Sequence, residues 1–290
     1  MSEIVQYCPL CSGEHSRLFE SRLFRGRVVI NRICQDCGLV FQSPHMTKAE
    51  LDVFYAEEYR LFQEGSIDPT LRNINAQERR ARALHDFVQE IILSVSRQLD
   101  IGCSMGILLK YFQSEYRNQS VGVEPGDAHR MYACKEGLVV YSSLEDLENA
   151  GEKRFDLISM SHVLEHLPDP IGYLTHLRES ILVSDGWLLL EVPNLYAHDS
   201  FEVAHLFAFS PHTLHEVLRK SGFEVVKYKK HGRPHSALLP LYLTVLCRPA
   251  SRLDHLPVHP ERGVGVKRRL GMLKRHILER LMPAQAWLKV

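Results

Sequence analysis

The sequence LDIGCSMG, at residues 99–106, decides the fold of this chain. A predicted strand that begins at Arg97 leads into it, and the helical pattern of residues 107–113 follows it. Glycine allows a backbone to approach a ligand closely, and open α/β sheets bind their ligands at the carboxyl ends of the strands. The stretch therefore predicts a strand, a ligand-binding turn and a helix, in that order.

Short apolar runs alternate with helical patterns on either side of this turn. Strands are predicted at residues 97–101, 120–124, 138–142, 155–161, 187–192, 223–229 and 239–247. Prolines after Asp169 and Ser210 indicate helix starts, and Gly137 and Gly222 indicate helix ends. Such alternation is typical of an α/β fold, and it predicts a Rossmann-like, mostly parallel sheet of seven strands.

Glu124 adds a second feature to the predicted ligand site. It ends the strand after Gly102, 22 residues further along, where a carboxylate can accept hydrogen bonds from both hydroxyls of a ribose. Two ligands compete for such a site, a dinucleotide and S-adenosylmethionine (SAM). The loop lacks the middle glycine of the G-x-G-x-x-G fingerprint, which admits a pyrophosphate. The loop therefore disfavours a dinucleotide.

Two motifs carry a resemblance to a known family. The turn resembles the first motif of class I SAM-dependent methyltransferases, D-x-G-x-G-x-G, with Ser104 in place of the central glycine. Residues 155–170, FDLISMSHVLEHLPDP, are similar to the fourth-strand motif of that family. The resemblance implies the seven-stranded class I fold and SAM as cofactor. The cofactor residues that it implies are Asp100, Gly102, Cys103 and Gly106 in the turn, Glu124 at the ribose, Ser142, Ser143 and Leu144 at the adenine, and Ser161 and His162 near the sulfonium.

The motif also contains Glu165 and His166, for which a structural role is expected. A Glu-His pair just before a helix start can cap or brace the helix that begins at Asp169. Tyr55 and Tyr59 are candidates for closing over the cofactor, although aromatic residues at helical spacing more often belong to a core.

The acceptor is expected beside residues 201–212, between the fifth strand and the next helix. The run His-Leu-x-x-Phe-Ser there resembles the acceptor-side loop of zinc-binding methyltransferases of deoxysugar and surface-glycan biosynthesis. The sugar C-methyltransferases of that group carry Tyr-His-Glu-His, of which only the last residue remains here, as His205, while Glu202 takes the position of the tyrosine. The resemblance implies O-methylation of a sugar or glycan-type acceptor with His205 as base. Carbon methylation is the alternative, and His205 could instead only order the loop.

The catalytic candidates from this comparison are therefore His205, His162 and Glu202. A base is needed only where the acceptor loses a proton, as a hydroxyl or a carbon acid does, because alignment supplies much of the rate of methyl transfer.

Two cysteine pairs near the start predict a metal site. Cys8-x-x-Cys11 and Cys34-x-x-Cys37 are separated by 22 residues, and a hairpin is expected between them. Four thiolates at this spacing suit tetrahedral Zn²⁺. A closed four-thiolate site has no open position for a substrate, so the zinc is expected to be structural, contributing on the order of 10 kcal/mol to folding.

The composition sets limits on the function. The 35 basic and 35 acidic residues cancel, so no overall charge points to nucleic acid or membrane as the partner. The start has no basic segment followed by an apolar run, and no stretch of about 18 apolar residues occurs. Paired cysteines in a reducing compartment favour metal binding over disulfides. We therefore expect a cytoplasmic protein.

The chain is predicted to have four parts. Residues 1–45 form a zinc-ribbon-like module, 46–94 a helical connector or cap, 95–248 the SAM-binding domain, and 249–290 a basic, partly helical tail. In the tail, basic residues interleave with Leu270, Leu273, Ile277 and Leu281 at helical spacing. A helix packed on its own domain or on a second subunit is the favoured interpretation, and a peripheral membrane contact is the alternative. The oligomeric state is left open.

An RNA acceptor is a competing interpretation. Some ribosomal-RNA guanine methyltransferases also join a zinc module to this fold, so a base of rRNA or tRNA is a possible acceptor. Five arginines between the cysteine pairs could contact phosphates: Arg17, Arg22, Arg25, Arg27 and Arg32. The neutral overall charge and the lack of clustered aromatic residues disfavour nucleic acid.

Overall fold

A seven-stranded sheet forms the centre of the molecule. The computed structural model describes residues 2–55, 68, 70–199, 201–252 and 257–289. The strands of the sheet, in spatial order, are β12 (Phe223–His231), β13 (Tyr242–Pro249), β10 (Leu182–Pro193), β9 (Phe155–Ser161), β6 (Arg97–Ile101), β7 (Gln119–Val123) and β8 (Val139–Tyr141). The pairings from β10 to β8 are parallel, and β13 is antiparallel to both of its neighbours. The predicted fold class is thus confirmed.

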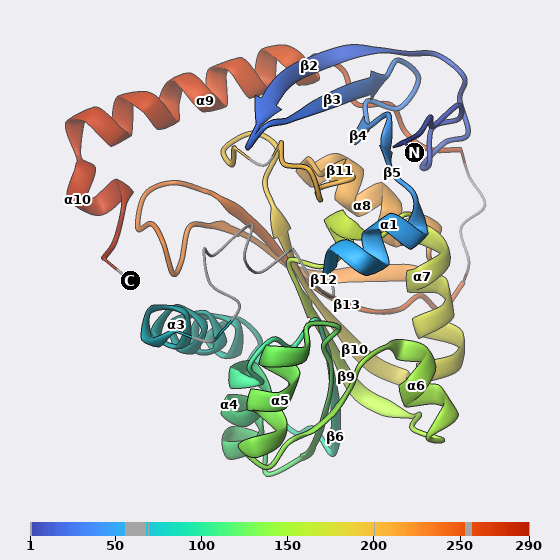
Figure 1. Cartoon of the computed structure of the whole chain (residues 1–290), viewed down its shortest axis with the longest axis vertical. Helices are drawn as coiled ribbons and strands as arrows, with labels where there is room; N and C mark the ends of the chain where they lie inside the picture. Colours follow the sequence, from blue (N-terminus) through green and yellow to red (C-terminus); the bar gives the residue numbers. More distant parts are fainter. Residues whose placement is uncertain (1, 56–67, 69, 200, 253–256, 290) are drawn as a thin grey trace.

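Helices cover both faces of this sheet (Figure 1). On one face lie α3 (Leu71–Val88), α4 (Ile107–Tyr116) and α5 (Asp127–Lys135), and on the other lie α6 (Leu144–Asn149), α7 (Pro170–His176) and α8 (Pro211–Lys220). Side chains alternate along a strand, so Leu189 of β10 joins the core under α3 and α4 while Leu188 and Leu190 join the core under α7 and α8. A 3₁₀ turn, η2 (Leu164–His166), follows β9, and a π-helical segment, η3 (Leu177–Ile181), follows α7.

Most of the predicted helix boundaries are confirmed. Asp169 and Ser210 cap α7 and α8, each followed by a proline at the first helical position. Gly137 and Gly222 follow helices with φ of +87° and +77°, a region that favours glycine. The last strand begins at residue 242 instead of the predicted 239, because Pro240 has no N–H to donate to a strand ladder.

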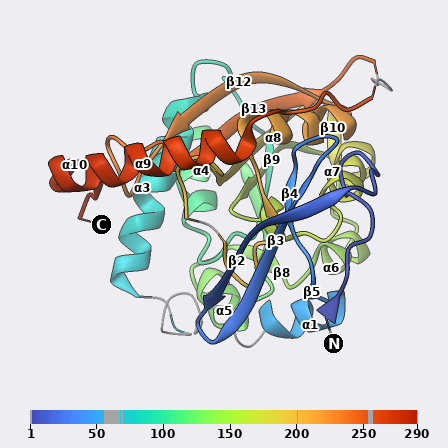
Figure 2. The ribbon, with the colours of Figure 1, turned by 90° about the horizontal axis from the view of Figure 1, so that it is seen from above.

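A second sheet lies beside the first. It joins three strands of the predicted zinc module to one strand of the predicted acceptor loop. Its order is β11-β4-β3-β2, from β2 (Ser16–Phe24), β3 (Arg27–Cys34), β4 (Val40–Gln42) and β11 (Phe207–Ala208). The β2–β3 pair is the hairpin expected between the cysteine pairs. Figure 2 shows this sheet lying across the main one. Strand β11 comes from the predicted acceptor loop, so the module and that loop share one sheet.

Short elements link the small sheet to the main domain. Strands β1 (Ser2–Glu3) and β5 (His45–Met46) pair with each other, and α1 (Lys48–Val53) follows with Thr47 as a capping residue. Tyr59, one of the two tyrosines considered for the cofactor, lies outside the described residues.

Helix α9 (Val264–Leu281) confirms the helix expected in the basic tail, and α10 (Pro283–Ala286) follows it. It packs on its own chain through Val264 and Leu278, which join two hydrophobic clusters, and through arginines. Arg268 lies 4.2 Å from the ring centroid of Phe201, and Arg275 donates a hydrogen bond to the carbonyl of Ala197. The aliphatic residues Val266, Leu270, Leu273, Ile277 and Leu281 are exposed, so the stripe does not pack on the described part of the chain. None of the helices in that part is both long and apolar enough to span a membrane.

Candidate active site

A cavity of about 1300 Å³ lies at the carboxyl ends of β6, β7 and β9. Its lining contains eight of the residues predicted for the cofactor: Asp100, Gly102, Cys103, Glu124, Ser142, Ser143, Ser161 and His162. The lining also contains all three catalytic candidates, His162, Glu202 and His205. Segments that are far apart in the sequence therefore share one cavity.

Two residues predicted for the cofactor, Gly106 and Leu144, do not line this cavity. Gly106 is the N-cap of α4, and a Cβ there would lie 2.2 Å from Leu138, so its role is close packing. Leu144 begins α6 and packs against the main core.

The turn after β6 has the backbone that its glycines predict. Gly102 has φ +73°, and a Cβ there would lie 2.5 Å from Val163. Ser104 also has a positive φ, +52°, at the position where the family motif has glycine. Its N–H donates to Glu124 Oε2 over 2.8 Å, and its Oγ lies 2.7 Å from His129 Nδ1. These contacts hold a non-glycine residue in a conformation that glycine adopts more easily.

Glu124 is buried, and both oxygens of its carboxylate accept backbone hydrogen bonds. Oε2 accepts from Ser104, and Oε1 accepts from the N–H of Gly126 over 3.0 Å. A carboxylate has about four acceptor positions, so each oxygen can accept a further hydrogen bond. The position at the end of β7 therefore suits recognition of a pair of hydroxyls.

Asp100 is fully buried at the end of β6, where it lines the cavity. Burial raises the pKa of its carboxyl to about 7, Glu124 also raises it, and a hydrogen bond of 2.7 Å from Ser159 Oγ lowers it. Near neutral pH, Asp100 is therefore divided between its protonated and ionised forms.

Histidines gather at the other end of the cavity. The rings of His166 and His205 have centroids 4.7 Å apart with an interplanar angle of 67°. His166 Nδ1 lies 2.9 Å from the carbonyl oxygen of Ala204, so the Nδ1–H donates there and Nε2 has the lone pair. Burial and the nearby His205 lower the pKa of His166 to about 4, which keeps it neutral at pH 7. The ring of Tyr55 meets His166 edge-on at 5.6 Å.

Glu165 lies next to this pair, buried to 1% exposure. His162 Nδ1 is 3.4 Å from its Oε1. Burial raises the pKa of Glu165, but His162 and His166 outweigh burial and hold that pKa at about 2. Glu165 and His166 do not cap α7, because Asp169 caps that helix. The carbonyl of Glu165 instead accepts the N–H of Leu206, and so joins η2 to the acceptor loop.

A second buried carboxylate, Glu191 in β10, lies on the other side of His162. Its neighbours are Arg80 Nε at 3.1 Å, His162 Nε2 at 3.4 Å and His231 Nε2 at 3.2 Å. Burial and Arg80 lower the pKa of His162, but the two carboxylates Glu165 and Glu191 outweigh them and raise it. His162 itself has φ +58°, a strained backbone of the kind often found at functional sites.

Helix α3 contributes residues that the sequence did not single out. Arg72, Gln77 and Arg80 line the cavity, and Gln77 donates to Ser104 Oγ over 3.0 Å. The predicted connector is thus part of the site wall.

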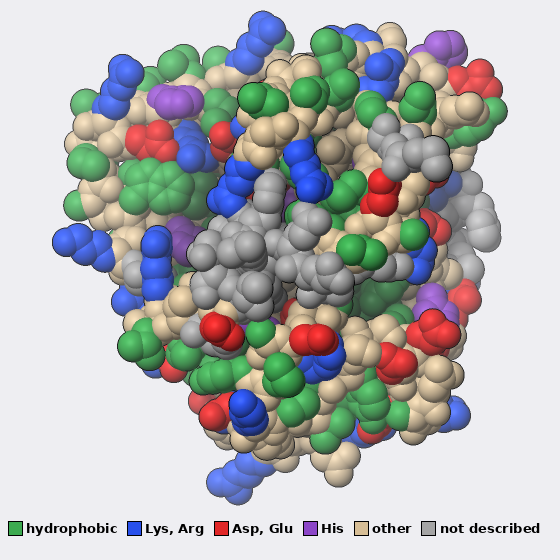
Figure 3. All heavy atoms as spheres, viewed as in Figure 1, with side chains coloured by type: hydrophobic (Ala, Val, Ile, Leu, Met, Phe, Trp, Pro, Cys, Tyr) green, Lys and Arg blue, Asp and Glu red, His purple; other side chains and the backbone are tan. Residues whose placement is uncertain are grey.

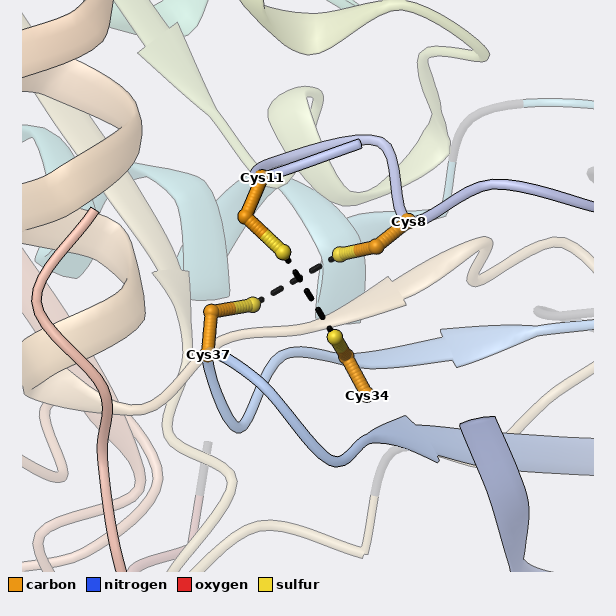
Figure 4. A group of neighbouring side chains, drawn as sticks. All are labelled: Cys8, Cys11, Cys34 and Cys37. Carbon is orange, nitrogen blue, oxygen red and sulfur yellow. Dashed lines mark hydrogen bonds between the residues drawn. The ribbon is translucent and has the colours of Figure 1, made fainter. Parts of the chain in front are cut away.

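The four predicted metal ligands form one cluster (Figure 4). The Sγ atoms of Cys8 and Cys37 are 3.5 Å apart, and those of Cys11 and Cys34 are 3.6 Å apart. All four sulfurs lie within 4.8 Å of one another. Tetrahedral Zn–S bonds of about 2.3 Å place neighbouring sulfurs roughly 3.8 Å apart, so the cluster is compatible with zinc.

Residues 75–228 match the family model described as a methyltransferase domain, which covers more than half of the chain. The chain belongs to this methyltransferase-domain family. The cavity lies within the methyltransferase domain at the position that the class I SAM-dependent fold implies, with only Leu51, Tyr55 and a few other lining residues outside the matched segment.

Curated relatives of the methyltransferase domain are named ubiquinone biosynthesis O-methyltransferase. The protein of that name from Cereibacter sphaeroides is 30% identical over an alignment of 157 residues, and the match covers 46% of this chain and 62% of that protein. The one from Hahella chejuensis is 32% identical over an alignment of 97 residues, and the match covers 31% of this chain and 40% of that protein. The match thus spans less than two thirds of the length of these relatives.

Solved structures support the fold of the methyltransferase domain. The 1,6-didemethyltoxoflavin-N1-methyltransferase of Burkholderia thailandensis, with bound 1,6-didemethyltoxoflavin and S-adenosylhomocysteine, is 19% identical. It has a TM-score of 0.57 and covers 80% of this chain and 100% of its own. A SAM-dependent methyltransferase from Archaeoglobus fulgidus is 21% identical, with a TM-score of 0.52, and covers 66% of this chain and 99% of its own.

Proposed function

We propose that this protein transfers the methyl group of SAM to a hydroxyl of a small molecule. One observation carries the proposal: the turn anchored by Glu124 and the His166–His205 pair line, or lie beside, a single cavity. The names of the relatives support oxygen as the methylated atom.

The residues at one end of the cavity fit the cofactor. Glu124 offers carboxylate oxygens to the ribose, Asp100 faces the amino-acid part, and Ser161 and His162 flank the reacting end. Ser142 and Ser143 stand at the adenine end. When bound, SAM supplies an electrophilic methyl group.

At the other end, His205 receives the proton of the acceptor hydroxyl. That proton leaves as the acceptor oxygen bonds to the methyl carbon and the carbon–sulfur bond breaks, which yields S-adenosylhomocysteine. His166 stays neutral because of its low pKa, and its ring packs against His205 and limits how that ring turns.

A sugar or glycan hydroxyl is the acceptor that the loop at residues 201–212 favours, since it keeps His205 of the motif described above. Carbon methylation of a sugar has less support, because Glu202 occupies the position of the tyrosine that would assist it. The relatives' names favour a non-sugar hydroxyl instead, so both acceptor classes belong in the assay.

An RNA acceptor has less support. Arg22 is engaged with Asp199 and the carbonyl of Phe201, and Arg32 is engaged with Ser16. On the face in Figure 3, basic and acidic side chains are interspersed and do not form one basic patch.

We also propose that the cysteine cluster holds Zn²⁺. Four thiolates complete a tetrahedral shell, so the ion has a structural role and no substrate position.

The proposed function is tested by incubating the full chain with methyl-labelled SAM and three acceptor sets: nucleotide sugars and glycans, phenolic hydroxyl compounds, and RNA. We expect label in a hydroxyl compound, and we expect His205→Asn to abolish it while His215→Asn, an exposed histidine on α8, does not. Label in RNA alone, or no SAM binding by calorimetry, would overturn the proposal.

A further inference from the structure

Three buried side chains beside the acceptor end of the cavity form a cluster of a different kind. Glu165 offers a carboxylate oxygen, and His166 and His205 each offer a ring nitrogen, with these three atoms within 4.8 Å of one another. They come from η2 and from the acceptor loop. Two backbone contacts hold these segments together: Leu206 N–H to the carbonyl of Glu165, and His166 Nδ1–H to the carbonyl of Ala204.

The carboxylate of Glu165 lacks the hydrogen bonds that its burial calls for. The side chain is 1% exposed, and neither oxygen has a hydrogen-bond partner among the residues that the structure describes. The ion pair with His162 Nδ1, at 3.4 Å, is longer than a good hydrogen bond. Buried carboxylates are normally paired and hydrogen-bonded, or they coordinate a metal. Glu165 is directed toward the two histidines.

The histidine nearest to Glu165 in sequence is arranged as metal-binding histidines are. Its Nδ1–H donates to a backbone carbonyl, and metal-binding histidines commonly donate their second ring N–H to such a group.

We propose that Glu165, His166 and His205 bind a divalent transition-metal ion at the acceptor end of the cavity, separately from the cysteine cluster. Two histidines and one carboxylate are a ligand set of catalytic zinc and of non-haem iron(II), and imidazole with carboxylate also suits manganese(II). Three protein ligands leave coordination positions open, in contrast to the closed set of four cysteines.

The open positions suit an acceptor oxygen. A bound cation would act as a Lewis acid and lower the pKa of a coordinated hydroxyl, whose proton would then pass to solvent water as the oxygen bonds to the methyl carbon. With the ion bound, His205 would hold the ion, and without the ion it would accept the proton directly. This role rests on the proposed function, but the binding of the ion does not, because it depends only on the three side chains.

The test measures the metal content of the full chain without SAM or acceptor. Zinc-loaded protein is incubated with Mn²⁺, dialysed against metal-free buffer and analysed for both elements. We expect a total of two metal ions per chain in the wild type, and one in Glu165→Gln and in His205→Asn, each of which keeps the zinc of the cysteine cluster. His176→Asn, which removes an exposed histidine paired with Glu148, is the matched control and keeps two.

A total of one ion in the wild type, or two in both variants, would overturn the proposal. The fold of each variant is checked by circular dichroism and thermal melting, so a loss of metal through unfolding is recognised. A chain that holds two ions but transfers no methyl group keeps this inference and removes the proposed function.

Discussion

The ring centroids of His166 and His205 lie 4.7 Å apart. The two residues belong to segments that precede and follow β10 in the sequence, and the fold brings these segments together. His166 also bonds to Ala204, the residue just before its partner. The loop that presents His205 is therefore fixed by the 3₁₀ turn that presents His166. Because the two rings depend on the same contacts, changing either one affects the acceptor end of the cavity.

Replacement of His205 by asparagine is expected to lower the turnover number by roughly 10²- to 10⁴-fold, the usual contribution of a positioned proton acceptor. His166→Asn is also expected to lower it, because the ring of His166 limits how the ring of His205 turns. SAM affinity should stay close to normal, because the cofactor residues lie at the other end of the cavity. Steady-state kinetics and calorimetry separate the two effects. Equal losses of SAM affinity and turnover would place the pair in the cofactor site.

Glu124→Ala is expected to weaken SAM binding by roughly 10- to 100-fold, as the loss of hydrogen bonds to a charged group does. Zinc content should not change. Ser104→Gly is the matched control. It keeps the backbone N–H that donates a hydrogen bond to Glu124, and glycine adopts the positive φ of this position without strain. We expect near-normal affinity in the control, and calorimetry compares the variants directly. Normal affinity in Glu124→Ala would mean that the ribose lies elsewhere.

Asp100 makes stability depend on pH. Its pKa is raised from 3.8 to about 7, so the folded chain binds the proton more tightly than the unfolded chain between those values. Stability therefore falls as the pH rises from about 4 to about 7, by up to roughly 4 kcal/mol for three pKa units. Asp100→Asn should remove this fall, with a higher Tm than the wild type at pH 8.

The control for this measurement is Asp185→Asn, an exposed position in β10. Thermal melts at half-unit steps from pH 4.5 to pH 8 give the two curves. If the Tm of the wild type and that of Asp100→Asn change equally with pH, protonation of Asp100 does not affect the stability of the fold.

Removal of zinc is expected to impair methyl transfer more than SAM binding. The carbonyl of Leu206 accepts the N–H of Gln42, and β11 pairs with β4, so the cysteine module supports the loop that presents His205. Chelation should lower the Tm by several degrees and turnover at least tenfold, with SAM affinity changed by less. Restoring zinc should restore turnover, whereas an unchanged Tm in zinc-free protein would contradict a structural metal.

Local chemistry explains which features could be predicted from the sequence. The turn at Gly102, the caps Asp169 and Ser210, and the cysteine pairs each depend on a few neighbouring residues, and the structure has them as expected. The position of Glu124 beside the ligand site could be predicted in the same way, because this residue directly follows β7, the strand next to the turn.

Residues that act through distant contacts were missed or misjudged. The local sequence relates Glu165 and His166 only to the nearest helix. Their partners in the structure belong to the acceptor loop, about 40 residues further along the chain. Arg80 lies on α3, and nothing in its local sequence relates it to Glu191. Glu191 did give a signal, since it interrupts the apolar run at residues 187–193 of β10. A buried acidic residue in such a run indicates a hydrogen-bonding or charged partner elsewhere in the chain, but the sequence does not identify that partner.

The pairing of Phe41 with Phe207 also has a consequence for biosynthesis. A ribosome releases the N-terminal hairpin early, but the strand that completes its sheet emerges only after most of the chain has been made. Until then, the free edge of β4 is open to wrong pairing with other chains. We therefore expect the pairing of β4 with β11 to form last during folding. In pulsed hydrogen exchange, the amides of these two strands should become protected late.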